Sequence, residues 1–146
     1  MRVLADRSQC LLASPRLVQH QGGEPSEPMD LAAWPTLGLG SPQEEFTWHL
    51  FGPEDKPAFV PHVPRLVTTD MSALRKAAVA GIGVVQLPRM MVRPELESGR
   101  LVPVLPQWTP RREIVHVVFP SRRGLLPAVR ALIDHLAEAF SALRED

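Results

Sequence analysis

The stretch that decides the fold is residues 65–88, which read RLVTTDMSALRKAAVAGIGVVQLP. Arg65–Thr68 predicts a strand, Met71–Ala80 has the spacing of an amphipathic helix, and Ile82–Leu87 predicts a second strand that Pro88 ends. A strand, a helix and a strand in this order are typical of a βαβ unit, whose two strands form a parallel pair with a right-handed crossover. We therefore expect an α/β fold.

Both ends of this helix carry recognisable signals. Thr69 or Asp70 can cap the amino end, because a short polar side chain accepts hydrogen bonds from the first backbone amides. Gly81 stands where a left-handed residue commonly ends a helix. The buried stripe is expected to consist of Met71, Leu74, Ala77 and Ala78.

Upstream, where proline is abundant, the sequence predicts short elements. Gln9–Ala13 is an apolar run that indicates a buried strand, and Ser14 can cap a helix that starts at Pro15. Phe46–Phe51 alternates as a strand does, and Pro57–Val63 predicts its return strand in an antiparallel hairpin, at a sheet edge. A helical turn and a further strand are expected over Met29–Ala33 and Thr36–Leu39.

Downstream, Arg89–Ser98 predicts a helix interrupted at Pro94, and Leu101–Leu105 predicts a short strand. Glu113–Phe119 is the strongest strand of the chain, and its near-continuous apolar run indicates a strand covered on both faces. Leu125–Leu143 is the strongest helix, with apolar residues at helical spacing.

Composition excludes several classes of protein. The 146 residues include 16 Lys and Arg and 16 Asp and Glu, so the formal net charge is +0 and the basic excess of a nucleic-acid-binding domain is lacking. The single cysteine, Cys10, rules out an internal disulfide. Because neither a continuous apolar signal segment nor a transmembrane stretch is visible, we expect a cytoplasmic protein with no membrane association.

Several short motifs follow one another in a defined order along the chain. They are Leu11-Leu12-Ala13-Ser14-Pro15, Pro28-Met29-Asp30-Leu31, Thr69-Asp70 before Leu74, Ala80-Gly81-Ile82-Gly83-Val84 before Leu87-Pro88, Gly99-Arg100-Leu101-Val102, and Phe119-Pro120-Ser121-Arg122-Arg123. In this order and at these spacings, the motifs resemble the effector domain of LysR-type transcriptional regulators. The resemblance extends over nearly the whole chain.

The resemblance implies a fold like that of periplasmic solute-binding proteins. Residues 1–108 would form one effector-binding lobe, with a mostly parallel sheet flanked by helices and a β-hairpin. Residues 109–146 would supply the C-terminal strand and helix of the partner lobe, whose other elements have no counterpart here. The resemblance further implies a small-molecule effector between the lobes, a homodimer or higher homo-oligomer, and DNA contact only through a helix-turn-helix domain absent from this chain.

The residues that could bind the effector fall into three groups. Strand ends and helix amino termini favour anions, so Thr68, Thr69, Asp70 and Met71 are the first candidates, although plain helix capping explains them as well. The resemblance places the segment Gly40-Ser41-Pro42 through Phe46 at the mouth of the cleft, with Ser41 and Phe46 as its candidate residues, and an ordinary surface turn is the alternative. Leu87 and Pro88 form the third group, with a simple strand end as the alternative.

Other chemistry has little support in the sequence. Gly81-Ile82-Gly83 precedes a strand and lacks the third glycine of a dinucleotide loop, so no cofactor is expected. The five histidines show no metal-ligand spacing, so we expect no metal. Ser14 has no nucleophile elbow around it, and no catalytic residue is predicted. Cys10, in a predicted strand, fits a buried apolar group better than a redox sensor.

We therefore expect a non-enzymatic sensor domain that binds a small effector, anionic in one interpretation, and modulates DNA binding and transcription by a larger regulator. The alternatives are a solute-binding module of the periplasmic-binding-protein type and a remnant that serves dimerisation only. A small α/β enzyme would need a nucleophile with a base or a cofactor loop.

Overall fold

The computed structural model describes residues 1–120 and 123–143, so Ser121 and Arg122 of the last motif lie outside the described residues. The chain divides into two compact units. The larger unit is Gln9–Arg111, and the smaller unit combines Met1–Ser8 with Arg112–Asp146. We expected the division at residues 108 and 109, so the structure differs mainly in assigning the first eight residues to the C-terminal unit.

The main sheet of the larger unit contains five strands in the order β6 (Leu66–Thr68), β3 (Leu37–Leu39), β7 (Val85–Pro88), β2 (Gln9–Ala13) and β8 (Val102–Pro103). β3 runs parallel to β6, and a parallel bridge between Thr36 and Val84 joins it to β7. β2 is antiparallel to both β7 and β8.

Two details of this sheet differ from the sequence-based expectation. The βαβ unit is present, but its two strands are not a direct pair, because β3 lies between β6 and β7. The sheet is mixed rather than mostly parallel, since the buried central strand β2 runs against its neighbours. The α/β fold class itself is confirmed.

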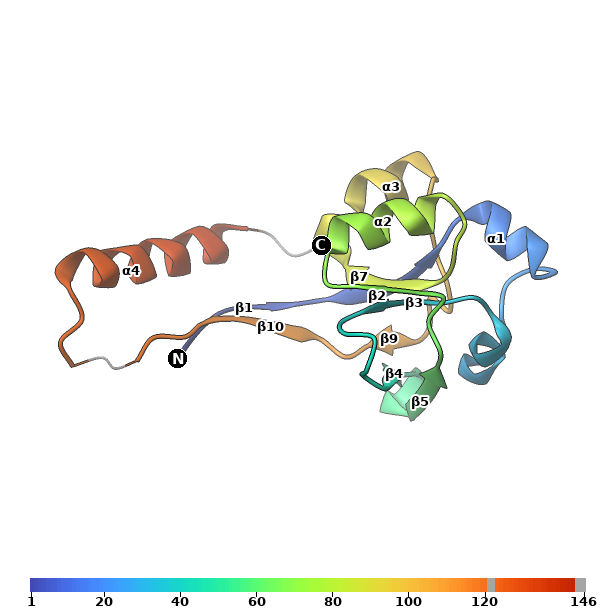
Figure 1. Ribbon diagram of the computed structural model, residues 1–146, viewed down its shortest axis with the longest axis horizontal. Helices are drawn as coiled ribbons and strands as arrows, with labels where there is room; N and C mark the ends of the chain where they lie inside the picture. Colours follow the sequence, from blue (N-terminus) through green and yellow to red (C-terminus); the bar gives the residue numbers. More distant parts are fainter. Residues whose placement is uncertain (121–122, 144–146) are drawn as a thin grey trace. The chain divides into compact units, whose positions relative to one another are not determined.

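Helices α2 (Met71–Val79) and α3 (Arg93–Ser98) cover one face of this sheet (Figure 1). The predicted stripe is confirmed: Leu74 and Ala78 are buried, and Met71 and Ala77 pack partly against the same core. Pro94 does not interrupt a helix as expected. It occupies the first turn of α3, where its missing N–H costs nothing, and Gly99 ends α3 with a φ of 74°.

The hairpin of β4 (Phe46–Phe51) and β5 (Pro57–His62) lies on the other side of the main sheet (Figure 1). The predicted antiparallel hairpin and the edge position of its return strand are confirmed, and β9 (Thr109–Pro110) pairs with the other side of β4. Trp48 and Leu50 point into a second core that contains Leu11 and Ala13 of β2.

The remaining elements of the larger unit are short. Ser14 caps α1 (Pro15–His20) by accepting a hydrogen bond from the Leu17 amide, as predicted. Three 3₁₀ helices complete the unit: η1 (Pro28–Ala33), η2 (Pro53–Asp55) and η3 (Arg89–Met91).

The smaller unit pairs β1 (Arg2–Arg7) antiparallel with β10 (Glu113–Val117) and packs α4 (Pro127–Ala142) against β1. The sequence did not predict β1. The cover expected on both faces of β10 is wrong in this structure, because a two-stranded ribbon with one helix leaves Ile114 and Val118 59% and 72% exposed. Among the described residues, no helix is long and apolar enough to cross a membrane.

Candidate functional site

Three strand ends meet at one edge of the main sheet. β6, β3 and β7 run in the same direction, so their carboxyl ends lie together at this edge. The Gly40 amide, just after β3, donates a hydrogen bond of 3.1 Å to the carbonyl of Thr68 at the end of β6. Ligands of open α/β sheets bind outside the carboxyl ends of parallel strands. The structure thus brings members of all three predicted groups to this edge, which we call the carboxyl edge.

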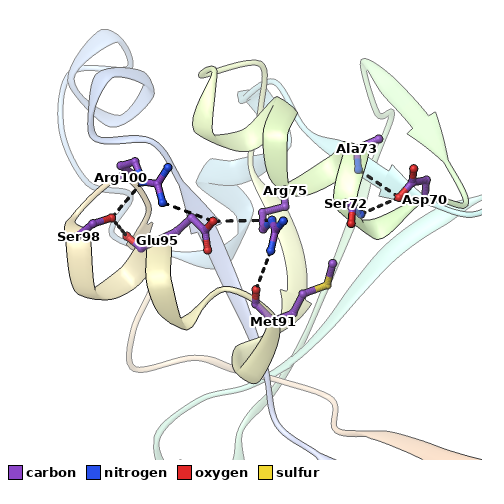
Figure 2. A network of polar contacts seen from close by, with 8 residues as sticks. All are labelled: Asp70, Ser72, Ala73, Arg75, Met91, Glu95, Ser98 and Arg100. Atoms are coloured by element: carbon purple, nitrogen blue, oxygen red, sulfur yellow. Dashed lines mark hydrogen bonds and ion pairs between the residues drawn. The ribbon is translucent and has the colours of Figure 1, made fainter.

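The first group forms the amino end of α2. The Asp70 carboxylate accepts hydrogen bonds from the amides of Ser72 and Ala73, at 2.8 and 3.3 Å (Figure 2). The Asp70 amide donates to the Thr68 hydroxyl at 3.1 Å. Capping therefore occupies Thr68 and Asp70, and an incoming anion would have to displace the chain's own carboxylate. Thr69 is exposed, whereas Thr68 is half-buried.

The second group is split between two places. Ser41 follows β3 in a tight turn, where its amide donates to a Glu44 carboxylate oxygen at 3.0 Å and its hydroxyl bonds to the Gln43 side chain. Phe46 instead lies on the face of the sheet away from α2, since an added Cβ at Gly38 would stand 2.7 Å from its ring. Ser41 is thus at the carboxyl edge, whereas Phe46 is beneath it.

The third group ends β7. Leu87 is fully buried in the core under α2, so its side chain supports the sheet, and its carbonyl accepts a 3.6 Å hydrogen bond from the Cys10 thiol. Pro88 is half-buried and pairs with Gln9 across the ladder. Burial raises the pKa of the Cys10 thiol to about 11, although the positive charge of Arg89 lowers it in part.

Sequence reasoning missed two residues at this edge. Arg89 directly follows Pro88 and is half-buried, and its guanidinium makes no hydrogen bond or ion pair with any residue in the described ranges 1–120 and 123–143. Gln9 is only 4% exposed, and its amide nitrogen has no hydrogen-bond partner in the described part of the chain. A basic residue immediately after a strand-ending proline was the available signal for Arg89.

A buried carboxylate ties α2 to α3. A Glu95 oxygen lies 3.7 Å from the Arg75 guanidinium of α2 and 3.7 Å from that of Arg100, and Arg75 also donates to the Met91 carbonyl at 3.4 Å (Figure 2). Glu95 is buried beneath these arginines. The network fixes the helix whose amino end borders the carboxyl edge.

A separate hollow of about 530 Å³ lies on the opposite face of the sheet, lined by Phe46, His62 and Val67 among others. The His62 ring stacks on Trp48, with ring centroids 3.9 Å apart, and its Nδ1 lies 2.7 Å from the Thr36 hydroxyl. Burial lowers the pKa of His62 to about 4, so the imidazole is neutral at pH 7.

Within the described part of the chain, no three His, Cys, Asp or Glu residues gather as metal ligands would.

Residues 1–141 match the family model described as LysR substrate binding domain. An HTH-type transcriptional repressor of Pseudomonas aeruginosa is 33% identical over 143 residues, covering 96% of this chain and 44% of that protein. The regulator PtxR, also of P. aeruginosa, is 31% identical over 137 residues, covering 92% of this chain and 43% of PtxR. The chain thus spans less than half the length of these two relatives.

A solved structure has the same fold. Full-length AphB, a virulence activator of Vibrio cholerae from the same regulator family, superposes with a TM-score of 0.78 at 21% identity. The superposition covers 95% of this chain and 47% of AphB. With the family model matching almost every residue, the resemblance in the motifs is confirmed, and the chain belongs to the LysR substrate-binding domain family.

Proposed function

We propose that the chain is the effector-sensing domain of a LysR-type transcriptional regulator and binds a small molecule at the carboxyl edge. The observation that carries this proposal is the meeting of three parallel strand ends, from segments far apart in the sequence, at one edge of the sheet. The relatives are named HTH-type regulators, which supports DNA binding through a helix-turn-helix domain of the whole protein. Gln9–Arg111 would contribute one lobe, and Met1–Ser8 with Arg112–Asp146 would contribute part of the other.

The chemistry of the edge favours distinct roles for its residues. The hydroxyls of Thr69 and Ser41 would hydrogen-bond to the effector. Its apolar atoms would contact the exposed parts of Pro88 and Met71. Leu87 and Phe46 would support the site from behind. Asp70 already satisfies the first amides of α2, so an acidic effector needs a different positive group. Arg89 supplies that charge without giving up another partner in the described chain.

This proposal makes the domain a binding module, without catalysis or a cofactor, in a cytoplasmic regulator. No observation favours the transport or enzyme alternatives. Self-association is a further part of the proposal, since the smaller unit leaves large apolar side chains 53–72% exposed: Val3, Ile114, Val118 and Leu126. Light scattering of the purified chain should give at least a dimer, and a monomer at high concentration would contradict this part.

A titration with two matched probes tests the binding edge. Benzoate and benzamide have the same shape, but only benzoate carries a charge at pH 7. Added to the ¹⁵N-labelled 146-residue chain, benzoate should shift the amide signals of Ser41, Thr69 and Arg89 in a saturable way. Arg89→Gln should weaken benzoate binding about threefold to tenfold, as the loss of one partly exposed charge pair implies. Benzamide binding should not change.

Two controls make the titration decisive. Arg16→Gln removes an equal charge from the exposed surface of α1 and should leave benzoate binding as it was. The double variant Thr69→Ala with Ser41→Ala should weaken both probes, because it removes hydroxyls rather than charge. Benzoate shifts confined to other regions, or equal losses in the Arg16 and Arg89 variants, would refute the assignment of the edge.

A further inference from the structure

We propose that the hollow beneath Phe46 is a second binding site, one that takes a small organic ammonium ion with an apolar body. It lies on the face of the sheet opposite α2, because Val67 pairs in register with Gly38 and Gly38 faces the Phe46 ring. Phe46 backs the proposed effector edge as well, but Glu44, Glu45, His62 and the prolines of the hollow are not among the residues of that edge, so a ligand here does not depend on the effector proposal.

The size and shape of the hollow suit a small ligand. Its volume of about 530 Å³ falls within the range of small-molecule pockets, roughly 300–1,000 Å³. Pro42, Pro61 and Pro64 contribute to the wall, and their ring-locked backbone leaves little conformational entropy to lose on binding. The hollow therefore needs little reorganisation to receive an apolar group.

Aromatic rings give the wall a face that attracts cations. The Phe46 ring is held in place by Gly38 and Pro64, because even a single added methyl at Gly38 would meet both at 2.7 and 2.8 Å. His62 lies beside it, with ring centroids 6.0 Å apart, and is backed by the stacked Trp48 ring. A phenyl ring carries partial negative charge on its face, so an ammonium group above Phe46 is stabilised.

The charged residues of the wall select the same ligand class. Glu44 and Glu45 both line the hollow, and none of its described lining residues is Lys or Arg. His62 adds no positive charge at neutral pH, because it remains an uncharged imidazole with its Nδ1 at the Thr36 hydroxyl. Glu44 accepts a hydrogen bond from the Ser41 amide through one oxygen, which orients its carboxylate without neutralising the charge. An anion would meet only repulsion here.

Three probes that share a phenylethyl body separate the effect of charge from that of shape: 2-phenylethylamine, 3-phenylpropionate and 2-phenylethanol. Each is titrated at low ionic strength into the ¹⁵N-labelled 146-residue chain. The amine should produce saturable shifts at the amides of Thr47, Val63 and Val67. It should bind about threefold to tenfold more tightly than the alcohol, the gain that a partly exposed charge pair gives, and 0.5 M NaCl should abolish that preference. The carboxylate should bind more weakly than the alcohol.

Charge variants connect the preference to the two glutamates. Glu44→Gln with Glu45→Gln keeps an oxygen acceptor for the Ser41 amide and should reduce the amine preference to below twofold, leaving alcohol binding unchanged. Glu97→Gln, on the exposed surface of α3, removes a like charge elsewhere and should change neither. Equal binding of amine and carboxylate overturns the proposal. So does the absence of saturable shifts at these amides, or an amine preference that survives in the double glutamine variant.

Discussion

Removing one charge of the Glu95 network should destabilise the larger unit, by an amount that depends on how exposed the remaining and the removed side chains are. The relevant changes are Glu95→Gln, Arg75→Met and Arg100→Met, each of which keeps side-chain volume close to the original. The Glu95 side chain is 9% exposed, and those of Arg75 and Arg100 are 31% and 57% exposed. Both charge pairs measure 3.7 Å, beyond hydrogen-bond length, so Coulomb attraction is the main contribution.

The magnitudes follow from exposure. An effective dielectric constant near 20 gives about 4 kcal/mol for unit charges at this separation, before solvent screening and the cost of burying the carboxylate are subtracted. Arg100 is mostly solvated, so its loss should cost less than about 1 kcal/mol. Loss of Arg75 leaves the buried carboxylate with only that solvated partner and should cost about 2–3 kcal/mol. Glu95→Gln leaves no buried charge, and about 1 kcal/mol is expected.

Urea unfolding followed by tryptophan fluorescence measures these differences, because Trp34, Trp48 and Trp108 all belong to the larger unit. The expected order of destabilisation is Arg75→Met first, then Glu95→Gln, then Arg100→Met. Combining the Arg75 and Glu95 changes should cost less than the sum of the two, since they remove the same interaction. Strict additivity, or an Arg100 variant as unstable as the Arg75 variant, would refute the reasoning.

Three other predictions follow from single sites. His62 titrates near 6.5 when unfolded and near 4 when folded, so acid protonates the unfolded chain first. The free energy of unfolding should fall by about 2 kcal/mol between pH 7 and pH 4, once the two pKa values are discounted for the solvent that reaches the half-buried ring. His62→Gln should flatten the part of that curve above pH 5. The Cys10 thiol, with its pKa raised from 9.0 to about 11, should react about a hundredfold more slowly with an aromatic disulfide at pH 8 than in urea, as thiolate fraction dictates. Gly38→Ala forces Phe46 and Pro64 apart and should cost about 1–3 kcal/mol in urea unfolding.

Local signals explain most of what the sequence predicted. Ser14 and Asp70 cap their helices, and the prolines of β5 keep that strand at an edge, because each effect depends on residues a few positions away. The same holds for Gly99, whose left-handed conformation ends α3. Such interactions are encoded within one turn or one hairpin.

The features that the sequence did not predict depend on contacts between residues far apart in the chain. β3 inserts between β6 and β7, although the chain runs from β6 to β7 through α2 alone, and no local pattern specifies that neighbour. β1 was missed because its Arg2–Arg7 segment carries three charged residues, and its partner β10 lies at the other end of the chain. The Glu95 network likewise joins residues of separate helices.

The sequence predicted where the candidate site lies but not how its residues interact. Thr69 and Ser41 do lie at one edge, but capping by Asp70 and the burial of Leu87 emerge from hydrogen bonds and packing that composition does not reveal. Arg89 was overlooked because its one signal, a basic residue after a strand-ending proline, is a single position without a motif around it. Whether these residues bind an effector stays a prediction.

The pairing of β1 with β10 also bears on the order in which the two units fold. Asp6 and Arg112, which form an ion pair of 3.0 Å in the smaller unit, are separated by 106 positions. The first strand therefore leaves the ribosome long before its partner exists, whereas Gln9–Arg111 is one continuous segment that can fold during synthesis. Closing a loop of that length in an unfolded chain costs about 4 kcal/mol in entropy. Once the larger unit has folded, the loop between β1 and β10 is no longer an unfolded chain, and this entropy has already been lost. We therefore expect the smaller unit to assemble last.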